Sequence, residues 1–340
     1  MFASLLVVAL IGAIAWAGSA IGLSYLFGVV LPYVAVVTFF LGVIWRMVYW
    51  AQSPVPFSIP TTGGQEKSLD FIKHEKWDCP NTKFGVVVRM FLEVCFFRSL
   101  FRNTAADVRE FDPVTKGPRT IYYSSKWLWF FALLFHYCFL LVFIRHFRFF
   151  MDPVPGWLTF MESIDGIMQI GAPRFFWTGG LLLVAVLFLL ARRLFNQRLR
   201  YISLMNDYFP LFLILGVVLS GICMRYFDKT DIAQVKVFIM GLVHFSPVAP
   251  DGISPLFFMH LAFVSVLLLY FPFSKLMHMP GVFFSPTRNL PTNTREVRHV
   301  NPWNPPKQYF TYAEYEDVYR DAMAEAGLPL EKQPSSKAAE

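Results

Sequence analysis

Residues 259–278, MHLAFVSVLLLYFPFSKLMH, decide the fold class, because they form an apolar run with a histidine near each end. Twenty residues at a helical rise of 1.5 Å per residue span about 30 Å, the thickness of the hydrocarbon core of a bilayer. The run therefore predicts a membrane-spanning helix. His260 and His278 are 18 residues apart. In one continuous helix that spacing is five turns, so both rings should lie on the same face, about 27 Å apart.

The composition of the whole chain agrees with a membrane protein. Its 340 residues are 56% hydrophobic and include 38 Phe, whereas a soluble domain is about 45–50% apolar. The net charge of +7 could suggest a nucleic-acid partner. However, the basic residues lie beside apolar segments, where they orient helices in the membrane. We therefore expect an integral membrane protein with no nucleic-acid partner.

The apolar segments predict six spans. Residues 3–50 would reach about 70 Å as one helix, roughly twice the thickness of a bilayer, so we divide them near Gly18, Ser19 and Gly22. The fold class is therefore an all-α membrane protein, a six-span helical bundle. The expected spans are residues 3–20, 25–49, 127–149, 175–193, 207–226 and 255–278.

A polar insertion is expected between the second and third spans. It opens with a linker rich in proline and glycine, and Val86, Met90, Val94 and Phe97 then recur at helical spacing. We interpret it as a soluble insertion on the membrane surface, either a docking surface for a partner or a covering loop. The chain then divides into two N-terminal spans, the insertion, a four-helix bundle and a tail with a weak helix near 311–326, at residues 1–50, 51–125, 126–280 and 281–340.

The distribution of Lys and Arg predicts the orientation. Residues 51–125 hold ten of them, and the short turn at 194–206 holds two next to Arg192 and Arg193. The loops at 150–174 and 227–254 hold only one and two. Because basic loops stay on the cytoplasmic side, both termini and the insertion should be cytoplasmic.

Four histidines in two antiparallel spans form a constellation. His136 and His146 lie in the third span, and His260 and His278 in the sixth. Antiparallel packing pairs His136 with His278 near the cytoplasm, and His146 with His260 near the outside. Ionisable residues inside a membrane are costly and mark functional sites. The alternative is four bundle histidines that are satisfied by neighbouring side chains.

Each histidine pair could hold one haem iron. Two imidazoles would fill both axial positions, which suits electron transfer and leaves no open position for oxygen chemistry. The pairing therefore predicts two b haems and no catalytic residue of the chain's own. The four cysteines lack CxxC spacing, so an iron–sulfur cluster or zinc site built by this chain is not expected. The N-terminus lacks a basic region, so we expect a retained anchor, with a signal peptide as the alternative because of the small residues from Ala17 to Ala20.

At these residues the chain resembles the membrane cytochrome b (gamma) subunit family of respiratory nitrate reductase. An additional first span, the insertion and a longer tail resemble the M subunits of the Dsr membrane complexes of sulfate- and sulfur-metabolising microbes. The matching stretches are Leu31-Pro32-Tyr33-Val34-Ala35, Trp45-Arg46, Phe135-His136, His146-Phe147, Arg192-Arg193-Leu194-Phe195, Arg198 and Arg200, His260-Leu261, and Phe271-Pro272-Phe273-Ser274-Lys275-Leu276-Met277-His278.

The resemblance implies a set of cofactors and partners. It implies two haems b with these four histidines as axial ligands, menaquinol exchange near the outer haem, and electron passage to a cytoplasmic iron–sulfur subunit related to heterodisulfide reductase. It also implies periplasmic multihaem cytochrome c and iron–sulfur subunits, a second membrane subunit, and a place in the bacterial or archaeal cytoplasmic membrane. The process would be dissimilatory sulfur metabolism, such as sulfate respiration.

The quinol site cannot be carried over from the family residue by residue. A small residue precedes the outer histidine of the third span in that family, whereas Arg145 stands here, and no Lys begins the fourth span. Arg145 could pair with a haem propionate, and Arg145, Arg174 and Gln169 are candidates for contacting the quinone. Two other classes stay open: a transporter or proton channel using the same histidines, and a haem-free membrane anchor.

Overall fold

The computed structural model of the chain describes residues 1–53, 64–112, 114, 116–166, 174–248, 252–294, 297 and 309–331. The chain divides into two units. Met1–Ser53 and Ser58–Val297 form the first, and Pro54–Phe57 and Arg298–Glu340 form the second. The first unit contains the membrane-spanning helices and all four histidines of the predicted pairs.

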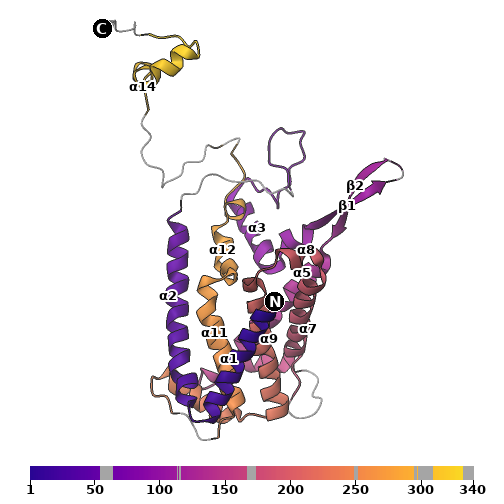
Figure 1. The fold of residues 1–340 in the computed structure, drawn as a ribbon, viewed down its shortest axis with the longest axis vertical. Coiled ribbons are helices and arrows are strands. Elements are labelled where there is room, and N and C mark those ends of the chain that lie inside the picture. Colours follow the sequence, from indigo (N-terminus) through magenta and orange to yellow (C-terminus); the bar gives the residue numbers. More distant parts are fainter. Residues whose placement is uncertain are drawn as a thin grey trace. The chain divides into compact units, whose positions relative to one another are not determined.

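Six helices of the described chain are long and apolar enough to cross a membrane, which confirms the predicted fold class (Figure 1). Two of the spans, Leu26–Ala51 and Met205–Asp228, include a π-helical turn, and a third, Lys126–Phe149, ends in a 3-10 turn. The α-helices are α1 (Phe2–Ala20), α2 (Leu31–Ala51), α5 (Lys126–His146), α7 (Trp177–Phe195), α9 (Met205–Cys223) and α11 (Pro255–Tyr270).

The predicted break in the first apolar stretch is confirmed. Helix α1 ends at Ala20, and Gly22 follows with φ of +99°. That backbone conformation is open to glycine at little cost but strained for residues with a Cβ atom. The chain turns there and enters α2, whose second residue is Pro32. Pro is well placed in the first turn of a helix because its missing N–H would have no intrahelical partner.

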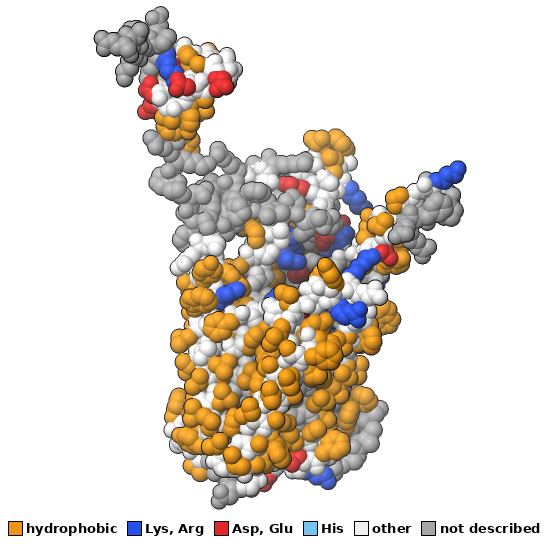
Figure 2. All heavy atoms as spheres, viewed as in Figure 1, with side chains coloured by type: hydrophobic (Ala, Val, Ile, Leu, Met, Phe, Trp, Pro, Cys, Tyr) orange, Lys and Arg blue, Asp and Glu red, His pale blue; other side chains and the backbone are white. Residues whose placement is uncertain are grey.

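The outer surface of the bundle is apolar. Figure 2 shows hydrophobic side chains covering the visible face of the bundle, with charged side chains gathered toward its ends. Inside, α11 packs against α1, α2 and α9, and Phe263 joins a buried cluster with Val8, Phe212 and Leu213. An apolar exterior together with an apolar core is the pattern of a helical bundle surrounded by lipid.

The sixth span is shorter than predicted, and the prediction of a continuous helix over residues 255–278 is wrong. Helix α11 ends at Tyr270, two 3-10 turns follow, and α12 (His278–Gly281) begins at the second histidine. Pro272 lacks the N–H of a helical residue and its ring collides with the preceding turn. Ser274 is extended, with φ of −119° and ψ of 178°. The estimate of five helical turns between His260 and His278 therefore does not apply.

The insertion contains both the expected helix and a β-hairpin that was not predicted. Its helices are α3 (Lys83–Phe96) and α4 (Arg98–Arg102). Strands β1 (Thr104–Asp112) and β2 (Gly117–Ser124) pair antiparallel, with Val108 opposite Thr120. Arg198, at the start of the bundle-side helix α8 (Gln197–Ile202), donates to the Ala106 carbonyl at 3.0 Å and anchors the hairpin.

Two of the loops between the predicted spans contain helices. They are α6 (Gly156–Asp165) and α10 (Ile232–Val243). Helix α10 buries Phe238 fully among Val29, Phe257 and Phe258. The loop is therefore part of the packed end of the bundle rather than a bare connection.

The second unit contains the helix predicted in the tail. Helix α14 (Tyr312–Glu325) begins with a capping box, in which Thr311 and Glu314 satisfy each other's backbone N–H groups. Glu316 is buried and pairs with Arg320 at 2.6 Å. The helix therefore has local interactions of its own.

Candidate functional site

The four histidines of the predicted constellation come together as two pairs. The ring centroids of His136 and His278 are 5.9 Å apart, and those of His146 and His260 are 6.4 Å apart. Helix α5 supplies His136 and His146, α11 supplies His260, and α12 supplies His278. The pairing expected from antiparallel spans is thus the arrangement in the structure, although the sixth span is broken between its two histidines. Their role as ligands stays a prediction.

Three of the four imidazoles are oriented by the backbone of their own segment. The Nδ1 atom of His136 lies 2.7 Å from the Ala132 carbonyl, and that of His146 lies 2.6 Å from the Val142 carbonyl. His278 Nδ1 lies 3.0 Å from the carbonyl of Lys275. A carbonyl can only accept, so Nδ1 carries the proton in each ring and Nε2 keeps its lone pair.

The fourth imidazole is oriented by a neighbouring helix. His260 Nδ1 lies 2.9 Å from the hydroxyl of Ser220 in α9. That hydroxyl donates to the Gly216 carbonyl at 2.7 Å, so its oxygen is free to accept from the His260 ring. Gly221 comes next, and a Cβ atom there would lie 3.4 Å from His260 Cε1. Ser220 therefore orients this ring, and Gly221 leaves room for it.

The spacing of the rings fits two imidazoles that share one metal ion. Metal–imidazole bonds are about 2.0 Å long, and a ring centre lies about 1.1 Å behind its nitrogen, giving about 6.2 Å between centres. The observed separations are 5.9 and 6.4 Å. Among the described residues no group of three or more His, Cys, Asp or Glu side chains could hold a bare metal ion. The pairs suit a cofactor that brings its own equatorial ligands.

Aromatic side chains surround both pairs. The rings of Phe97 and Phe135 lie 4.9 and 5.0 Å from that of His136, each edge to face. Phe149 lies 6.0 Å from His146. His136 is half-buried by these contacts, whereas His146 and His278 are exposed in the isolated chain. Apolar surroundings of this kind tune the potential of a bound redox group.

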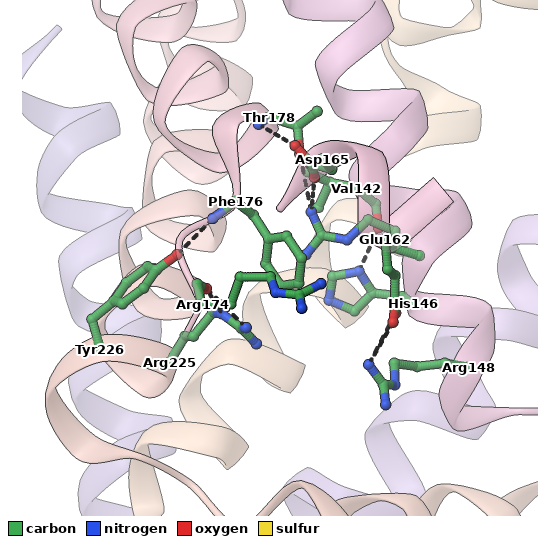
Figure 3. Close-up of polar contacts among 11 residues, drawn as sticks. Val142, His146, Arg148, Glu162, Asp165, Arg174, Phe176, Thr178, Arg225 and Tyr226 are labelled. Carbon is green, nitrogen blue, oxygen red and sulfur yellow. Dashed lines mark hydrogen bonds and ion pairs between the residues drawn. The ribbon is translucent and has the colours of Figure 1, made fainter. Parts of the chain in front are cut away.

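A buried polar cluster lies next to His146 (Figure 3). Arg145 forms an ion pair with Asp165 and donates to the Thr178 hydroxyl at 3.0 Å. Thr178 in turn donates to Asp165 from its backbone N–H at 2.9 Å and from its hydroxyl at 2.5 Å. The side chains of Arg145 and Asp165 are only 14% and 8% exposed. This cluster fixes α6 and the start of α7 to the end of α5.

A second arginine joins the cluster through an aromatic ring. The guanidinium groups of Arg145 and Arg225 lie 3.5 and 4.1 Å from the centre of the Phe176 ring. Arg225 also donates two hydrogen bonds to the Arg174 carbonyl, at 3.0 and 3.2 Å. Cation–π contacts of this kind stabilise a positive charge away from water. Arg225 therefore adds a positive charge beside the Arg145–Asp165 pair, at the end of the bundle that contains His146 and His260.

The quinone candidates have different positions. Arg145 is tied to Asp165, Arg174 contributes its carbonyl to Arg225, and Gln169 lies outside the described residues. Three carboxylates lie in the described part of the loop at 150–174. Asp165 and Glu162 pair with arginines, and their side chains are 8% and 14% exposed. The side chain of Asp152 is 70% exposed.

Sequence reasoning missed Arg225 and the role of Ser220. Arg225 is a charge at the end of an apolar span, and that position was the available signal. Ser220 lies close in sequence to Gly216 and Gly221, and such a group of small residues indicates close helix packing rather than a polar contact. A serine one helix away from a half-buried histidine carries no signal of contact until the helices are placed.

Six apolar helices of membrane-spanning length indicate a multi-pass membrane protein, and they bring four histidines together as two pairs. The sequence from residue 94 to 299 matches the family described as nitrate reductase gamma subunit. The chain belongs to this family, as its histidine spacings and flanking motifs predicted.

Three relatives illustrate the relationship. The chain is 48% identical over 288 residues to the Hdr-like menaquinol oxidoreductase cytochrome b-like subunit of Archaeoglobus fulgidus, covering 82% of this chain and 84% of that protein. It is 42% identical over 282 residues to the protein of that name from Archaeoglobus profundus, covering 81% and 82%. It is 29% identical over 160 residues to the respiratory nitrate reductase 1 gamma chain of Escherichia coli, covering 44% and 69%.

Proposed function

We propose that the chain is the cytochrome b subunit of a membrane quinol oxidoreductase complex and holds two b haems. The observation that carries the proposal is the pair of imidazole–imidazole separations, 5.9 and 6.4 Å, each with both Nδ1 atoms hydrogen-bonded. His136 and His278 would hold one haem, and His146 and His260 the other. The family and the names of the two archaeal relatives support the proposal.

Two such haems, when bound, would supply one-electron transfer. The chain's own residues do the rest of the work. The carbonyls of Ala132, Val142 and Lys275 and the hydroxyl of Ser220 fix the ring orientations. Phe97 and Phe135 keep water away from the ring of His136.

Menaquinol is the proposed electron donor, and the end of the bundle near His146 and His260 is its proposed site. The positive charge of Arg225 next to the Arg145–Asp165 pair supports this placement, since it would stabilise a developing negative charge on a quinone oxygen. Arg174 and Gln169 are further proposed contacts. Because Asp165 already bonds Arg145 and Thr178, it can take a proton only if that cluster opens.

Both termini and the insertion are proposed to lie in the cytoplasm, from the distribution of Lys and Arg. The insertion and tail would then carry a cytoplasmic iron–sulfur subunit related to heterodisulfide reductase, and the word "Hdr-like" in the relatives' names supports that partner. Periplasmic multihaem cytochrome c and iron–sulfur subunits, a second membrane subunit and a role in dissimilatory sulfur metabolism complete the proposal.

A reduced-minus-oxidised visible spectrum of the purified full chain, with the haem content per protein, tests this function. We expect the bands of a b-type cytochrome and two haems per chain. A chain that folds with no haem would instead be a transporter, a proton channel or a membrane anchor. A single haem would leave one histidine pair without its proposed role.

A further inference from the structure

Helix α3 of the insertion presents an apolar stripe to its surroundings. Phe84, Val87, Phe91 and Val94 are spaced by three, four and three residues, so they share one face. Their exposed fractions run from 75% at Phe84 to 42% at Val94. A helix on the surface of a soluble domain would point such side chains inward.

Two of the three charged residues of α3 lie on the opposite, inward side, whereas Lys83, its first residue, is exposed. Arg89 is buried with an exposed fraction of 5%, and Glu93 pairs with Arg288 of α13 (Pro286–Asn289) at 3.2 Å. The helix is therefore apolar toward its surroundings and charged toward the protein. A helix that faces water has the opposite arrangement, with its polar side outward. A helix that faces lipid has an apolar side outward, as α3 does.

The end of α3 contacts the first turns of α5, one of the six membrane-spanning helices. The carbonyl of Phe96 accepts from Trp129 Nε1 at 2.7 Å, and the carbonyl of Cys95 accepts from the Tyr137 hydroxyl at 2.9 Å. Trp129 and Tyr137 lie 3 and 11 residues into α5, or about 5 and 16 Å along its axis. The corner between α3 and α4 therefore lies alongside the first turns of α5, within about 16 Å of its start along the axis.

The corner has the backbone pairing that a segment in lipid needs. Phe97 adopts a left-handed conformation, with φ of 51° and ψ of 45°, and turns the chain directly from α3 into α4. The two carbonyls before it are bonded to α5, and Glu93 accepts from the backbone N–H and the hydroxyl of Ser99 at 2.9 and 2.6 Å. Non-helical backbone is tolerated at membrane depth only when its polar groups are satisfied in this way.

We propose that α3 and α4 form a re-entrant element, which enters the membrane beside α5 and turns back at Phe97, and that lipid acyl chains cover its apolar stripe. Neighbouring outward side chains of α5, Phe130 and Tyr137, are also exposed and aromatic, so the stripe continues a surface of a membrane-spanning helix. In this proposal only α3 and α4 leave the cytoplasmic side, and the β1–β2 hairpin stays there as a docking element. The inference rests on the membrane location of the bundle and not on haem binding.

A series of aspartate substitutions in the full chain, reconstituted in lipid nanodiscs, tests the depth. Phe and Val differ little from Asp in helix propensity, so the series reports mainly on the surroundings. We expect the loss of thermal stability to grow from Phe84→Asp through Val87→Asp and Phe91→Asp to Val94→Asp. Val108→Asp, on the exposed β1 strand, is the matched control and should change little. Equal small effects at all four positions would overturn the re-entrant placement.

Photolabelling identifies what covers the stripe. The probe is a phosphatidylcholine with a diazirine near the end of its acyl chain, placed in nanodiscs that contain only this chain. Labelled peptides from residues 84–94 together with none from residues 104–124 would support lipid contact. Labelling absent from residues 84–94 but present on α1 would contradict it and leave a protein partner or water as the occupant. The readout is independent of haem content, so a failure of the proposed function would not affect it.

Discussion

The two histidine pairs share the same ligand chemistry but are built in different ways. His278 follows a break in the sixth span, and the re-entrant corner at Phe97 covers its partner His136. His260 lies within a regular helix and is oriented by Ser220 of another helix, while its partner His146 adjoins the buried arginine cluster. One pair therefore depends on the insertion and on local turns, and the other on packing between helices. The comparison predicts that each pair can be perturbed alone.

The largest expected effect is the loss of one haem. His136→Ala or His278→Ala should remove the haem of the first pair, and His146→Ala or His260→Ala that of the second, because each iron would lose an axial ligand. Haem content and a potentiometric titration would show one remaining centre. Retention of two haems in any of these variants would refute that residue as a ligand.

The next effect is on stability near the second pair. Asp165→Ala leaves Arg145 buried without its carboxylate, and breaking a buried ion pair costs about 3–5 kcal/mol. Thermal unfolding in nanodiscs measures the loss. The control is Asp152→Ala, which breaks the pair with Lys236 but lies at an exposed position, 70% accessible. Such exposed pairs contribute about 0–1 kcal/mol. Equal losses in the two variants would show that the cluster around Arg145 is not a structural anchor.

A smaller effect is expected at Ser220. Ser220→Ala removes the acceptor for His260 Nδ1 and should weaken retention of the second haem, since partners of this kind change metal affinity by about 10–100-fold. Ser220→Thr keeps the hydroxyl and should restore the parent behaviour. Ser265→Ala serves as the control, because that hydroxyl bonds the Leu261 carbonyl on its own helix. An unchanged haem titration in Ser220→Ala would contradict the positioning role.

The smallest effect on either pair should follow removal of the β-hairpin. Replacing residues 104–124 with a short Gly-Ser linker removes a ribbon that is exposed along nearly all of its described side chains. We expect both haem spectra to be unchanged and the cytoplasmic iron–sulfur partner to be lost from the purified complex. A two-stranded hairpin is marginally stable on its own, which favours a partner that covers it. Co-purification at parental levels would exclude the hairpin as a docking element.

Hydrophobic patterns were sufficient to predict the six spans, because a span needs little more than about twenty apolar residues. The pairing of His136 with His278 and of His146 with His260 followed from their depths in antiparallel spans. The break at Pro272 was visible in the sequence, but whether a proline kinks a helix or ends it depends on its neighbours; here Ser274 caps the turn that follows. The hairpin had a signal that we did not use, strand-like residues on both sides of Pro113–Gly117.

The polar contacts of the site could not be predicted, for a different reason. Arg225 reaches Phe176 and the Arg174 carbonyl across about fifty residues of sequence, and Ser220 reaches His260 across forty. Such contacts depend on how each helix is rotated about its axis. Helices that are apolar on almost every face give no sign of that rotation in their hydrophobic pattern. The sequence also does not show that Arg89 and Glu93 of α3 face the protein while Phe84 and Phe91 face outward.

The central claim is that two bis-histidine haems occupy these pairs. A cryo-electron microscopy map of the purified full chain in lipid nanodiscs tests it most directly. The account predicts a planar density between the rings of His136 and His278 and another between those of His146 and His260, with each iron bonded to two Nε2 atoms. A folded bundle with imidazoles in direct contact with other side chains and no planar density between them would contradict it.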